Sequence, residues 1–213
     1  MRILITSGPT REPIDPVRYL SNRSSGKMGF ALAEAALAAG HAVDLITGPV
    51  SIPAPENASV TRIETAQDMF DAVAEKIGSS DAAILCAAVA DYRVAEVSEE
   101  KIKKSDGTAT LTLVENPDIL GSARGTFGFT GILVGFAAET SELERHAFEK
   151  LQRKGCDLLV ANDVSRSDIG FDHDQNEVRL FFADGTTESI ARSSKQDIAG
   201  KILDHVARLA KGA

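Results

Sequence analysis

The sequence predicts an α/β domain of Rossmann-like, three-layer α/β/α architecture, with a mainly parallel sheet and a C-terminal antiparallel hairpin extension. Strand-like and helix-like segments alternate along most of the 213 residues. The segment 82–87 is apolar throughout, which is typical of a strand buried on both faces of a parallel sheet. Near the C-terminus, Ala183, Asp184 and Gly185 separate two strand-like segments, which indicates a hairpin.

The remaining elements follow from periodicity and from capping residues. Gly40 and Gly78 end two helices, and Thr65 is placed to cap the second of them. A further short helix is predicted to open with Asn116 as N-cap and Pro117 as its first residue. In chain order, we expect strands at 2–6, 42–46, 60–63, 82–87, 131–136, 157–160, 177–182 and 186–190, and long helices at 26–39, 66–77, 141–154 and 195–211. Together they are predicted to form one domain, 1–213.

Composition excludes several classes of function. The formal net charge of −8 gives no broad basic surface for nucleic acid. The N-terminus lacks the features of a signal peptide, and no apolar run approaches the ~20 residues that span a bilayer. Cys86 and Cys156 lack CxxC spacing, so we expect reduced, buried thiols, with a catalytic thiol as the alternative for Cys86. The sequence therefore predicts a cytoplasmic protein that binds neither nucleic acid nor membrane.

A polar, glycine-containing loop joins the first strand to the first helix. The N-terminus of a helix carries free N–H groups and partial positive charge, which favour anions. Arg11, Arg18 and Arg23 lie just upstream of that helix. The loop therefore predicts a site for a phosphorylated ligand. Its candidate substrate-binding residues are Gly8, Ser24, Ser25, Gly26 and Lys27.

Two common phosphate motifs are missing from this loop. A dinucleotide-binding fold needs GxGxxG in a tight turn and an acidic residue at the end of the second strand. Here the second strand ends at Thr47 and Gly48, and Asp44 lies inside it. A Walker loop is also excluded, because Lys27 is followed by Met28 and not by serine or threonine.

Small residues follow the apolar strand at 82–87, where the backbone could approach a ligand closely. Ala87 and Ala88 precede Asp91, which either meets ribose hydroxyls or a metal, or simply caps a turn. By composition alone Phe136 is a core residue. Lys150 and Lys154 share one helix face, and their spacing alone predicts that both face solvent.

The segment 91–107 does not fit the pattern of a core element. It is rich in charge, and three lysines fall within residues 101–104. Charge runs are usually solvated surface loops. However, this one follows a buried strand at the expected ligand edge, and long loops in compact domains are often lids. A surface loop and a mobile lid over 91–107 both remain open on composition.

The ordered set of these stretches resembles one family, bacterial phosphopantothenoylcysteine synthetase of the CTP-dependent type. That unit forms the second catalytic part of the bifunctional coenzyme A biosynthesis flavoprotein. The similarity extends over about residues 1–200. It is carried by residues 8–30, 87–93, 101–104, 116–119, 134–140 and 161–164.

The resemblance implies a phosphopantothenate–cysteine ligase. It implies that the carboxylate of 4′-phosphopantothenate attacks CTP to give an acyl-cytidylate and pyrophosphate, and that the amine of L-cysteine then displaces CMP. Asn22 corresponds to the residue that stabilises the acyl-cytidylate, with its amide as donor to the mixed anhydride. Lys101 corresponds to a lysine of the mobile loop that contacts the nucleotide and serves the second step, and Arg18 to an arginine that holds phosphopantothenate. Nucleotide contacts are implied for Ala87, Ala88, Asp91, Lys101, Asn116, Pro117, Asp118, Ile119, Phe136, Lys150 and Lys154.

The resemblance also implies partners. Mg²⁺ is expected with CTP, without an assigned set of metal-ligating residues, and a homodimer is expected through the antiparallel extension and neighbouring loops. A flavin-binding decarboxylase often precedes such a unit, whereas this sequence opens directly on the synthetase strand. We therefore expect no flavin here, and a separate flavin-dependent decarboxylase is a candidate partner. A non-catalytic nucleotide-binding module and an NAD-dependent oxidoreductase are the alternative functions.

Overall fold

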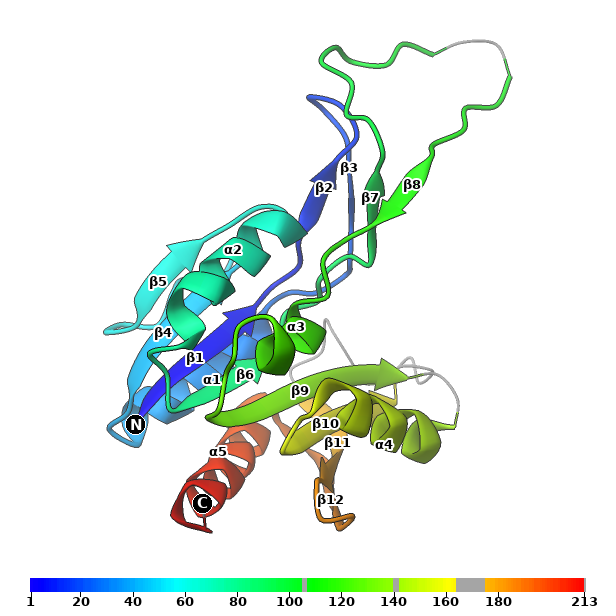
Figure 1. The fold of residues 1–213 in the computed structure, drawn as a ribbon. Helices are drawn as coiled ribbons and strands as arrows, with labels where there is room; N and C mark the ends of the chain where they lie inside the picture. The colour runs from blue at the N-terminus through cyan, green and yellow to red at the C-terminus, as the bar shows by residue number, and fades with distance from the viewer. Residues whose placement is uncertain (105–106, 140–141, 164–174, 213) are drawn as a thin grey trace.

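The fold is built on a mixed eight-stranded sheet, whose strands are labelled in Figure 1. The computed structural model describes residues 1–104, 107–139, 142–163 and 175–212. The strand order is β12-β11-β10-β9-β6-β1-β4-β5, and the strands from β10 to β5 are all parallel. These strands are β1 (Arg2–Ser7), β4 (Ala42–Thr47), β5 (Ser59–Arg62), β6 (Ala82–Leu85), β9 (Ile132–Glu139), β10 (Leu158–Asp163), β11 (Gln175–Phe182) and β12 (Thr187–Ser194). The predicted fold class, including the antiparallel hairpin of β11 and β12, is confirmed.

Helices cover both faces of the sheet because alternate strand residues point to opposite sides. In β1, Ile3 and Ile5 join the core under one set of helices, and Leu4 joins the core under the other. The first set is α1 (Lys27–Ala38) and α5 (Lys195–Gly212), and the second is α2 (Ala66–Ile77), α3 (Ile119–Gly125) and α4 (Leu143–Lys154). Both cores are apolar, so the sheet is buried between two helical layers.

Two predicted helix starts behave differently. Thr65 caps α2 as predicted, in a reciprocal capping box with Asp68. The prediction for α3 is wrong, because Asp118 and not Asn116 is the N-cap and its carboxylate accepts the N–H of Gly121 at 2.9 Å. The Asn116 side chain is used elsewhere, since its Nδ2 donates to the carbonyl of Ala90 at 2.8 Å. The predicted first residue of α4, at position 141, lies outside the described residues.

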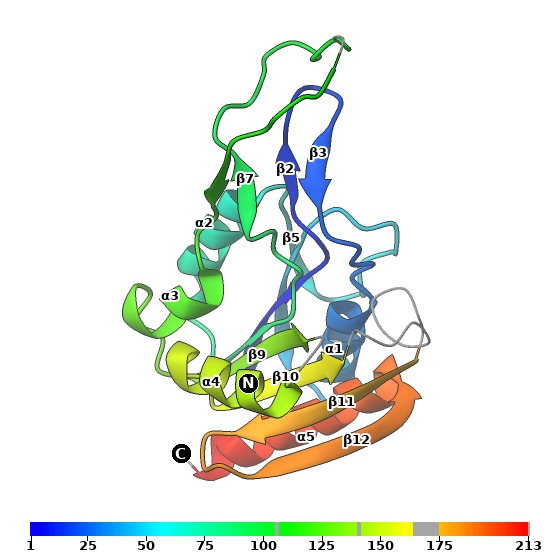
Figure 2. The same ribbon diagram turned by 90° about the vertical axis from the view of Figure 1, so that its right-hand side faces the viewer.

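Two short ribbons project from the sheet, as Figures 1 and 2 show. One pairs β2 (Arg11–Pro13) with β3 (Tyr19–Ser21), and the other pairs β7 (Tyr92–Val94) with β8 (Leu113–Glu115). We call residues 11–21, 92–104 and 107–115 the arm. The segment 91–107 is therefore not a plain loop, because β7 lies within it.

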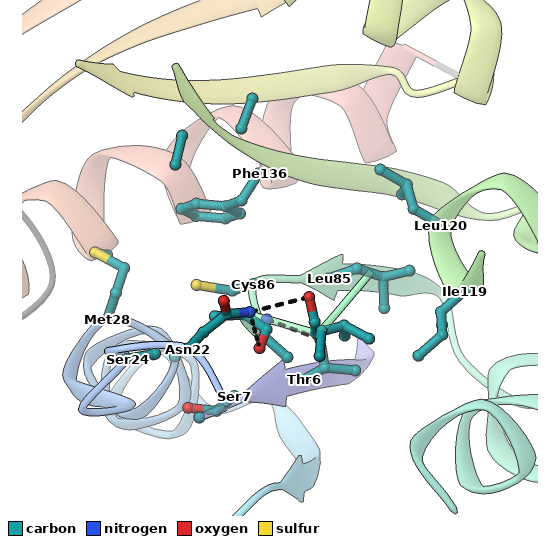
Figure 3. A pocket seen from close by; sticks show the side chains of 18 of the residues that line it. Thr6, Ser7, Asn22, Ser24, Met28, Leu85, Cys86, Ile119, Leu120 and Phe136 are labelled. Atoms are coloured by element: carbon teal, nitrogen blue, oxygen red, sulfur yellow. Dashed lines mark hydrogen bonds between the residues drawn. The ribbon is translucent and has the colours of Figure 1, made fainter. Parts of the chain in front are cut away.

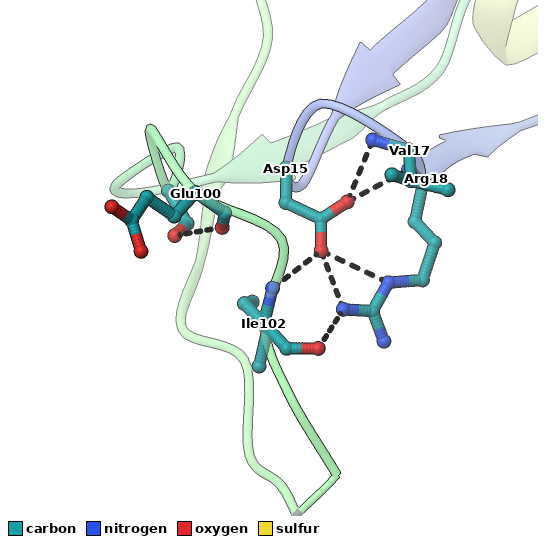
Figure 4. A network of polar contacts seen from close by, with 6 residues as sticks. Asp15, Val17, Arg18, Glu100 and Ile102 are labelled. Carbon is teal, nitrogen blue, oxygen red and sulfur yellow. Dashed lines mark hydrogen bonds and ion pairs between the residues drawn. The ribbon is translucent and has the colours of Figure 1, made fainter.

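The two parts of the arm are joined at the β2–β3 turn by one carboxylate, drawn in Figure 4. Asp15 accepts the backbone N–H groups of Val17 and Arg18, both at 2.9 Å, and that of Ile102 at 3.1 Å. The Arg18 guanidinium forms an ion pair with Asp15 and donates to the carbonyl of Ile102 at 2.7 Å. Asp15 thus ties the β2–β3 turn to the segment that carries Lys101.

In the part of the chain that the structure describes, no helix is both long and apolar enough to cross a membrane.

Candidate functional site

A cavity of about 960 Å³ opens at the carboxyl ends of the parallel strands β1, β6 and β9. This is the edge where α/β sheets bind ligands. Figure 3 shows Met28 and Ser24 at one end of the cavity, Ile119 and Leu120 at the other, and Phe136 facing Cys86 between them. The cavity therefore has two ends, one at α1 and one at α3.

The end at α1 is formed by the predicted phosphate loop. Gly26 is the N-cap of α1 with a left-handed φ of 78°, and its carbonyl accepts the hydroxyl of Ser7 at 3.0 Å. Helix α1 lies close to β1, because a Cβ on Gly29 would be 2.4 Å from the Oγ of Ser7. Short side chains thus bring the first turn of a helix to the edge of the sheet. All five predicted residues of this loop line the cavity: Gly8, Ser24, Ser25, Gly26 and Lys27.

Asn22 joins this loop to the end of β6. Its Nδ2 donates to the carbonyls of Ala88 at 3.0 Å and Val89 at 3.1 Å. The expected donor to a mixed anhydride is therefore already engaged with the backbone. Ala88 in turn donates its N–H to the carbonyl of Gly8 at 2.9 Å, so the small residues at 87–91 are fixed against the first loop. Ala87, Ala88 and Asp91 line the cavity.

The end at α3 gathers the predicted nucleotide contacts. Lys154 forms an ion pair with Asp118, and the Nζ of Lys150 donates to the carbonyl of Phe136 at 2.9 Å. Both lysines line the cavity, and the Lys154 side chain is only 13% exposed, so the solvent-facing placement predicted from spacing alone is wrong. Phe136 is half-buried at the cavity wall and not inside the core. The lining residues of the intervening turn are Asn116, Pro117, Asp118 and Ile119.

The pKa of Asp118 reflects this environment. Partial burial opposes ionisation, but the hydrogen bonds from Lys154 and from the backbone N–H of Gly121 outweigh it and lower the pKa of Asp118. The carboxylate is therefore charged at neutral pH. It caps α3 and positions a lysine of α4 at the same time.

Two predicted site residues lie away from the cavity. Arg18 and Lys101 are both in the arm, and neither is among the lining residues. Arg18 is engaged with Asp15, whose pKa is held well below its usual range by the Arg18 hydrogen bond and by three backbone N–H groups, against the opposing effect of burial. Lys101 is exposed beside Ile102. The structure thus separates the arm residues from the other candidates.

Residues 1–209 match the family described as the DNA/pantothenate metabolism flavoprotein C-terminal domain.

The chain belongs to this family.

Relatives and solved structures of the family are similar over almost the whole chain. The coenzyme A biosynthesis bifunctional protein CoaBC of Vibrio vulnificus (strain CMCP6) is 46% identical over 97% of this chain and 52% of its own length. The chain thus spans about half the length of the curated relatives it matches. The crystal structure of the C-terminal domain of CoaBC has a TM-score of 0.85 at 36% identity, and covers 100% of this chain and 96% of that one. A Cab2 mutant in complex with phosphopantothenate-cysteine shares the fold, with a TM-score of 0.82 at 19% identity over 99% of this chain and 86% of that one.

Sequence reasoning missed several residues of this family member's cavity. Asn176 and Lys195 both line it, although they are only 7% and 4% exposed. One signal was available for Asn176, because the alternation of side chains along β11 places it on the same buried face as Val178 and Leu180. Lys195 gave none, since a lysine in the first turn of a helix is normally solvated.

The two thiols are free, and the structure places them differently. Cys156 is buried as predicted, whereas Cys86 is half-buried and lines the cavity. Burial raises the pKa of Cys86 to about 12, against the opposing charge of Lys195, and burial also raises the pKa of Cys156 to about 12. Both thiols are therefore protonated at neutral pH, which disfavours the alternative of a nucleophilic Cys86.

Carboxylates are sparse around the cavity. Within residues 1–104, 107–139, 142–163 and 175–212, no three His, Cys, Asp or Glu side chains cluster so that they could hold a metal ion. Asp91, Glu115 and Asp118 are the carboxylates among the lining residues, and Asp118 is paired with Lys154. This donor set does not form an all-protein metal site, but it suits a cation that arrives bound to phosphates and takes one carboxylate.

Proposed function

We propose that this protein is a CTP-dependent phosphopantothenate–cysteine ligase of coenzyme A biosynthesis. In the first step a carboxylate oxygen of 4′-phosphopantothenate bonds to the α-phosphorus of CTP, and pyrophosphate leaves. In the second step the amine of L-cysteine bonds to the acyl carbon, loses a proton, and CMP leaves. Family membership supports this proposal, and the fold is shared with a protein solved with phosphopantothenate-cysteine.

The observation that carries the proposal is the two-ended cavity. One end offers the first turn of α1 with Lys27, and the other offers Lys150 and Lys154. A ligase that joins a phosphorylated acid to a nucleotide must hold two anionic molecules, with the reacting carboxylate and α-phosphate between them. Asn22 and the backbone at 88–89 lie between the two ends.

We assign the nucleotide to the end at α3. Phe136 supplies an aromatic face, and small residues at 87–90 allow close approach of a base or ribose. The two α4 lysines attract the triphosphate, and Mg²⁺ bound to that triphosphate would take Asp91 as a protein ligand. The cation would neutralise negative charge on the phosphates. The second end, at α1, is then left for phosphopantothenate.

Asn22 would act at the junction of the two substrates. Its amide donates hydrogen bonds to the backbone carbonyls of Ala88 and Val89. One of these hydrogen bonds must break before the amide can donate to the acyl-cytidylate. Such an exchange would make stabilisation of the intermediate depend on substrate binding. Lys101, on the arm, would have to approach the cavity for the second step.

We further propose a homodimer that works in the cytoplasm. The exposed large hydrophobic side chains of the described residues all lie in the arm, and such patches are typical of protein interfaces. They are Val17, Tyr19, Tyr92, Val97, Ile102, Leu111, Leu113 and Val114.

Unpaired thiols are typical of a reducing compartment, which supports the cytoplasmic location. A flavin-dependent decarboxylase, in the same or another polypeptide, would consume the product.

One assay tests the reaction directly. Pyrophosphate and CMP release from CTP are measured with all substrates, and again with phosphopantothenate or cysteine omitted. The proposal predicts pyrophosphate release only when phosphopantothenate is present, and stoichiometric CMP release only when both are. CTP binding without any pyrophosphate release would instead identify a non-catalytic nucleotide-binding module.

A further inference from the structure

The cavity wall at 87–91 is shaped by side chains from other segments of the chain. Here the chain leaves β6 and enters the arm without regular strand pairing, so its backbone groups need other partners. The N–H of Ala90 donates to the Oγ1 of Thr10 at 3.0 Å, and the carbonyl of Ala90 accepts the Nδ2 of Asn116 at 2.8 Å. Ala90 is thus held by one side chain from the first loop and by another from the turn before α3.

Thr10 connects this wall to the segment that carries Asn22. It is 0% exposed and is not among the residues that line the cavity. Its backbone N–H donates to the carbonyl of Ala88 at 3.4 Å, and its own carbonyl accepts the hydroxyl of Ser21 at 2.7 Å. Thr10 therefore contacts the wall at two places, and also the residue that directly precedes Asn22, from behind the cavity surface.

The two carbonyls that accept the Asn22 amide differ in their other donors. The Ala88 carbonyl accepts both Asn22 and the N–H of Thr10. Across the described residues, Asn22 is the only donor to the Val89 carbonyl. A carbonyl that loses its last donor in a partly buried place is costly, whereas one that keeps a second donor is not. The hydrogen bond that Asn22 can most easily give up is therefore the one to Ala88.

We propose that Thr10 is a positioning residue for the first step of the reaction. Its hydroxyl fixes the Ala90 peptide, and its N–H keeps the Ala88 carbonyl paired while the Asn22 amide turns to the acyl-cytidylate. This inference rests on the proposed function and extends it to a residue that touches no substrate. Asn22 can then change its partner without leaving a carbonyl unpaired and without moving the wall beneath it.

The test replaces the Thr10 hydroxyl with a methyl group. Thr10→Val keeps the size and branching of the side chain but leaves the Ala90 N–H without its acceptor, whereas Thr10→Ser keeps the oxygen. Thr47→Val is the matched control, because Thr47 is equally buried, ends the neighbouring strand and donates its hydroxyl to the carbonyl of Gly48 at 3.0 Å. Thermal unfolding checks the fold of each variant. If Thr10→Val does not fold, Thr10→Ala, which adds no bulk, takes its place.

The first step is measured as pyrophosphate release in single turnovers at saturating CTP and phosphopantothenate, and the KM for each comes from the complete reaction. A displacement of about 1 Å near the reacting atoms can cost about 100-fold in rate. Thr10→Val should therefore slow pyrophosphate release about 10- to 100-fold, while both KM values stay within about threefold of the parent. Thr10→Ser should stay within about threefold in rate, and Thr47→Val within about twofold even if it is less stable. Equal rate losses in Thr10→Val and Thr47→Val would reduce Thr10 to a structural role and end the proposal.

A double-mutant cycle with Asn22→Ala shows whether Thr10 acts through Asn22. In the Asn22→Ala background there is no amide to position, so adding Thr10→Val should cost less than about threefold in the rate of pyrophosphate release. The full loss of about 10- to 100-fold in that background would mean that the hydroxyl acts independently of Asn22, contrary to the proposal.

Hydrogen exchange at the Ala90 amide separates this inference from the ligase assignment. Exchange followed by NMR should be at least about tenfold faster in Thr10→Val than in the parent and unchanged in Thr10→Ser, because the lost hydrogen bond protects the amide. Equal exchange in Thr10→Val and the parent would overturn the proposal. If the parent releases no pyrophosphate, the ligase assignment fails, while faster exchange in Thr10→Val would still support Thr10 as the residue that holds the cavity wall.

Discussion

The cavity and the arm are built in opposite ways. The cavity lies at the edge of an eight-stranded sheet, and that sheet is held between two apolar cores. Backbone segments of the cavity wall are fixed by hydrogen bonds such as those of Asn22 and Ala88. The arm rests on two short ribbons, exposes its large apolar side chains, and is tied by the contacts of Asp15.

This difference indicates a division of labour. A preorganised cavity suits binding and charge stabilisation, because fixed dipoles need no rearrangement when charge develops. An arm with few buried contacts is free to move at low energetic cost. We infer that the first step needs only the cavity, and that the second step needs Lys101 to be brought in by the arm.

The largest effect is expected for Asn22→Asp. The change replaces two donated hydrogen bonds with a carboxylate facing the carbonyls of Ala88 and Val89, and it adds negative charge beside an anionic intermediate. We expect turnover to fall by more than about 100-fold, the scale of losing a group that stabilises a transition state. The measurement is pyrophosphate release, with circular dichroism to check the fold. Asn22→Ala, which adds no charge, should lose less; near-parental turnover in Asn22→Asp would remove Asn22 from the mechanism.

Lys101→Gln should affect only the second step. Pyrophosphate release in a single turnover should stay close to the parent, while amide formation falls about 10²- to 10³-fold, as for loss of one charge-stabilising group. Quenched-flow analysis should show the acyl-cytidylate accumulating. Lys103→Gln, on the same segment, is the matched control. Unimpaired amide formation in Lys101→Gln would show that the arm has no part in the second step.

Gly29→Ala tests how tightly the cavity is built. The new methyl group would overlap the side chain of Ser7, so α1 must shift away from β1. We expect a loss of about 1–3 kcal/mol in the free energy of unfolding, as for overpacking, together with weaker substrate binding. Gly200→Ala, on α5 with open space around it, should instead stabilise by up to about 1 kcal/mol. Urea denaturation of both variants checks the contrast, and equal effects would contradict it.

Asp15→Asn should loosen the arm and leave the cavity intact. Because the pKa of Asp15 is lowered in the folded protein, its stabilising contribution is present above its unfolded pKa of about 4 and is lost as the pH falls through the lower folded value. The charged Asp15 side chain thus ties the arm at neutral pH. Hydrogen exchange at 96–104 should be several-fold faster in Asp15→Asn at this pH, and unchanged in the exposed Asp204→Asn. If parent and Asp15→Asn exchange alike at neutral pH, Asp15 does not tie the arm.

The sequence was most informative where burial leaves a strong pattern. Strand β6 and the Thr65 cap of α2 could be predicted, because a continuous apolar run and a threonine just before a helical pattern have few other interpretations. The arm strands were missed, since three-residue strands with exposed faces show no alternation. The cap of α3 was misassigned because Asn116 and Asp118 are both good caps, and a tertiary contact to Ala90 decides between them.

The same limit applies to the site. The loop residues at 24–27 and the small residues at 87–88 could be predicted from local chemistry, because helix starts and strand ends are readable in one dimension. The placement of Lys154 could not, since its orientation depends on Asp118 from another helix. Lys195 was missed for the same reason, because only the antiparallel return of β11 places the start of α5 at the cavity.

We propose that one cavity holds the acid and the nucleotide so that the carboxylate attacks the α-phosphate. The most direct test labels the carboxylate of phosphopantothenate with heavy oxygen and analyses the products of one turnover by mass spectrometry. One labelled oxygen should appear in CMP and none in pyrophosphate. Label in inorganic phosphate, with CDP as the nucleotide product, would contradict it and indicate transfer of the terminal phosphate.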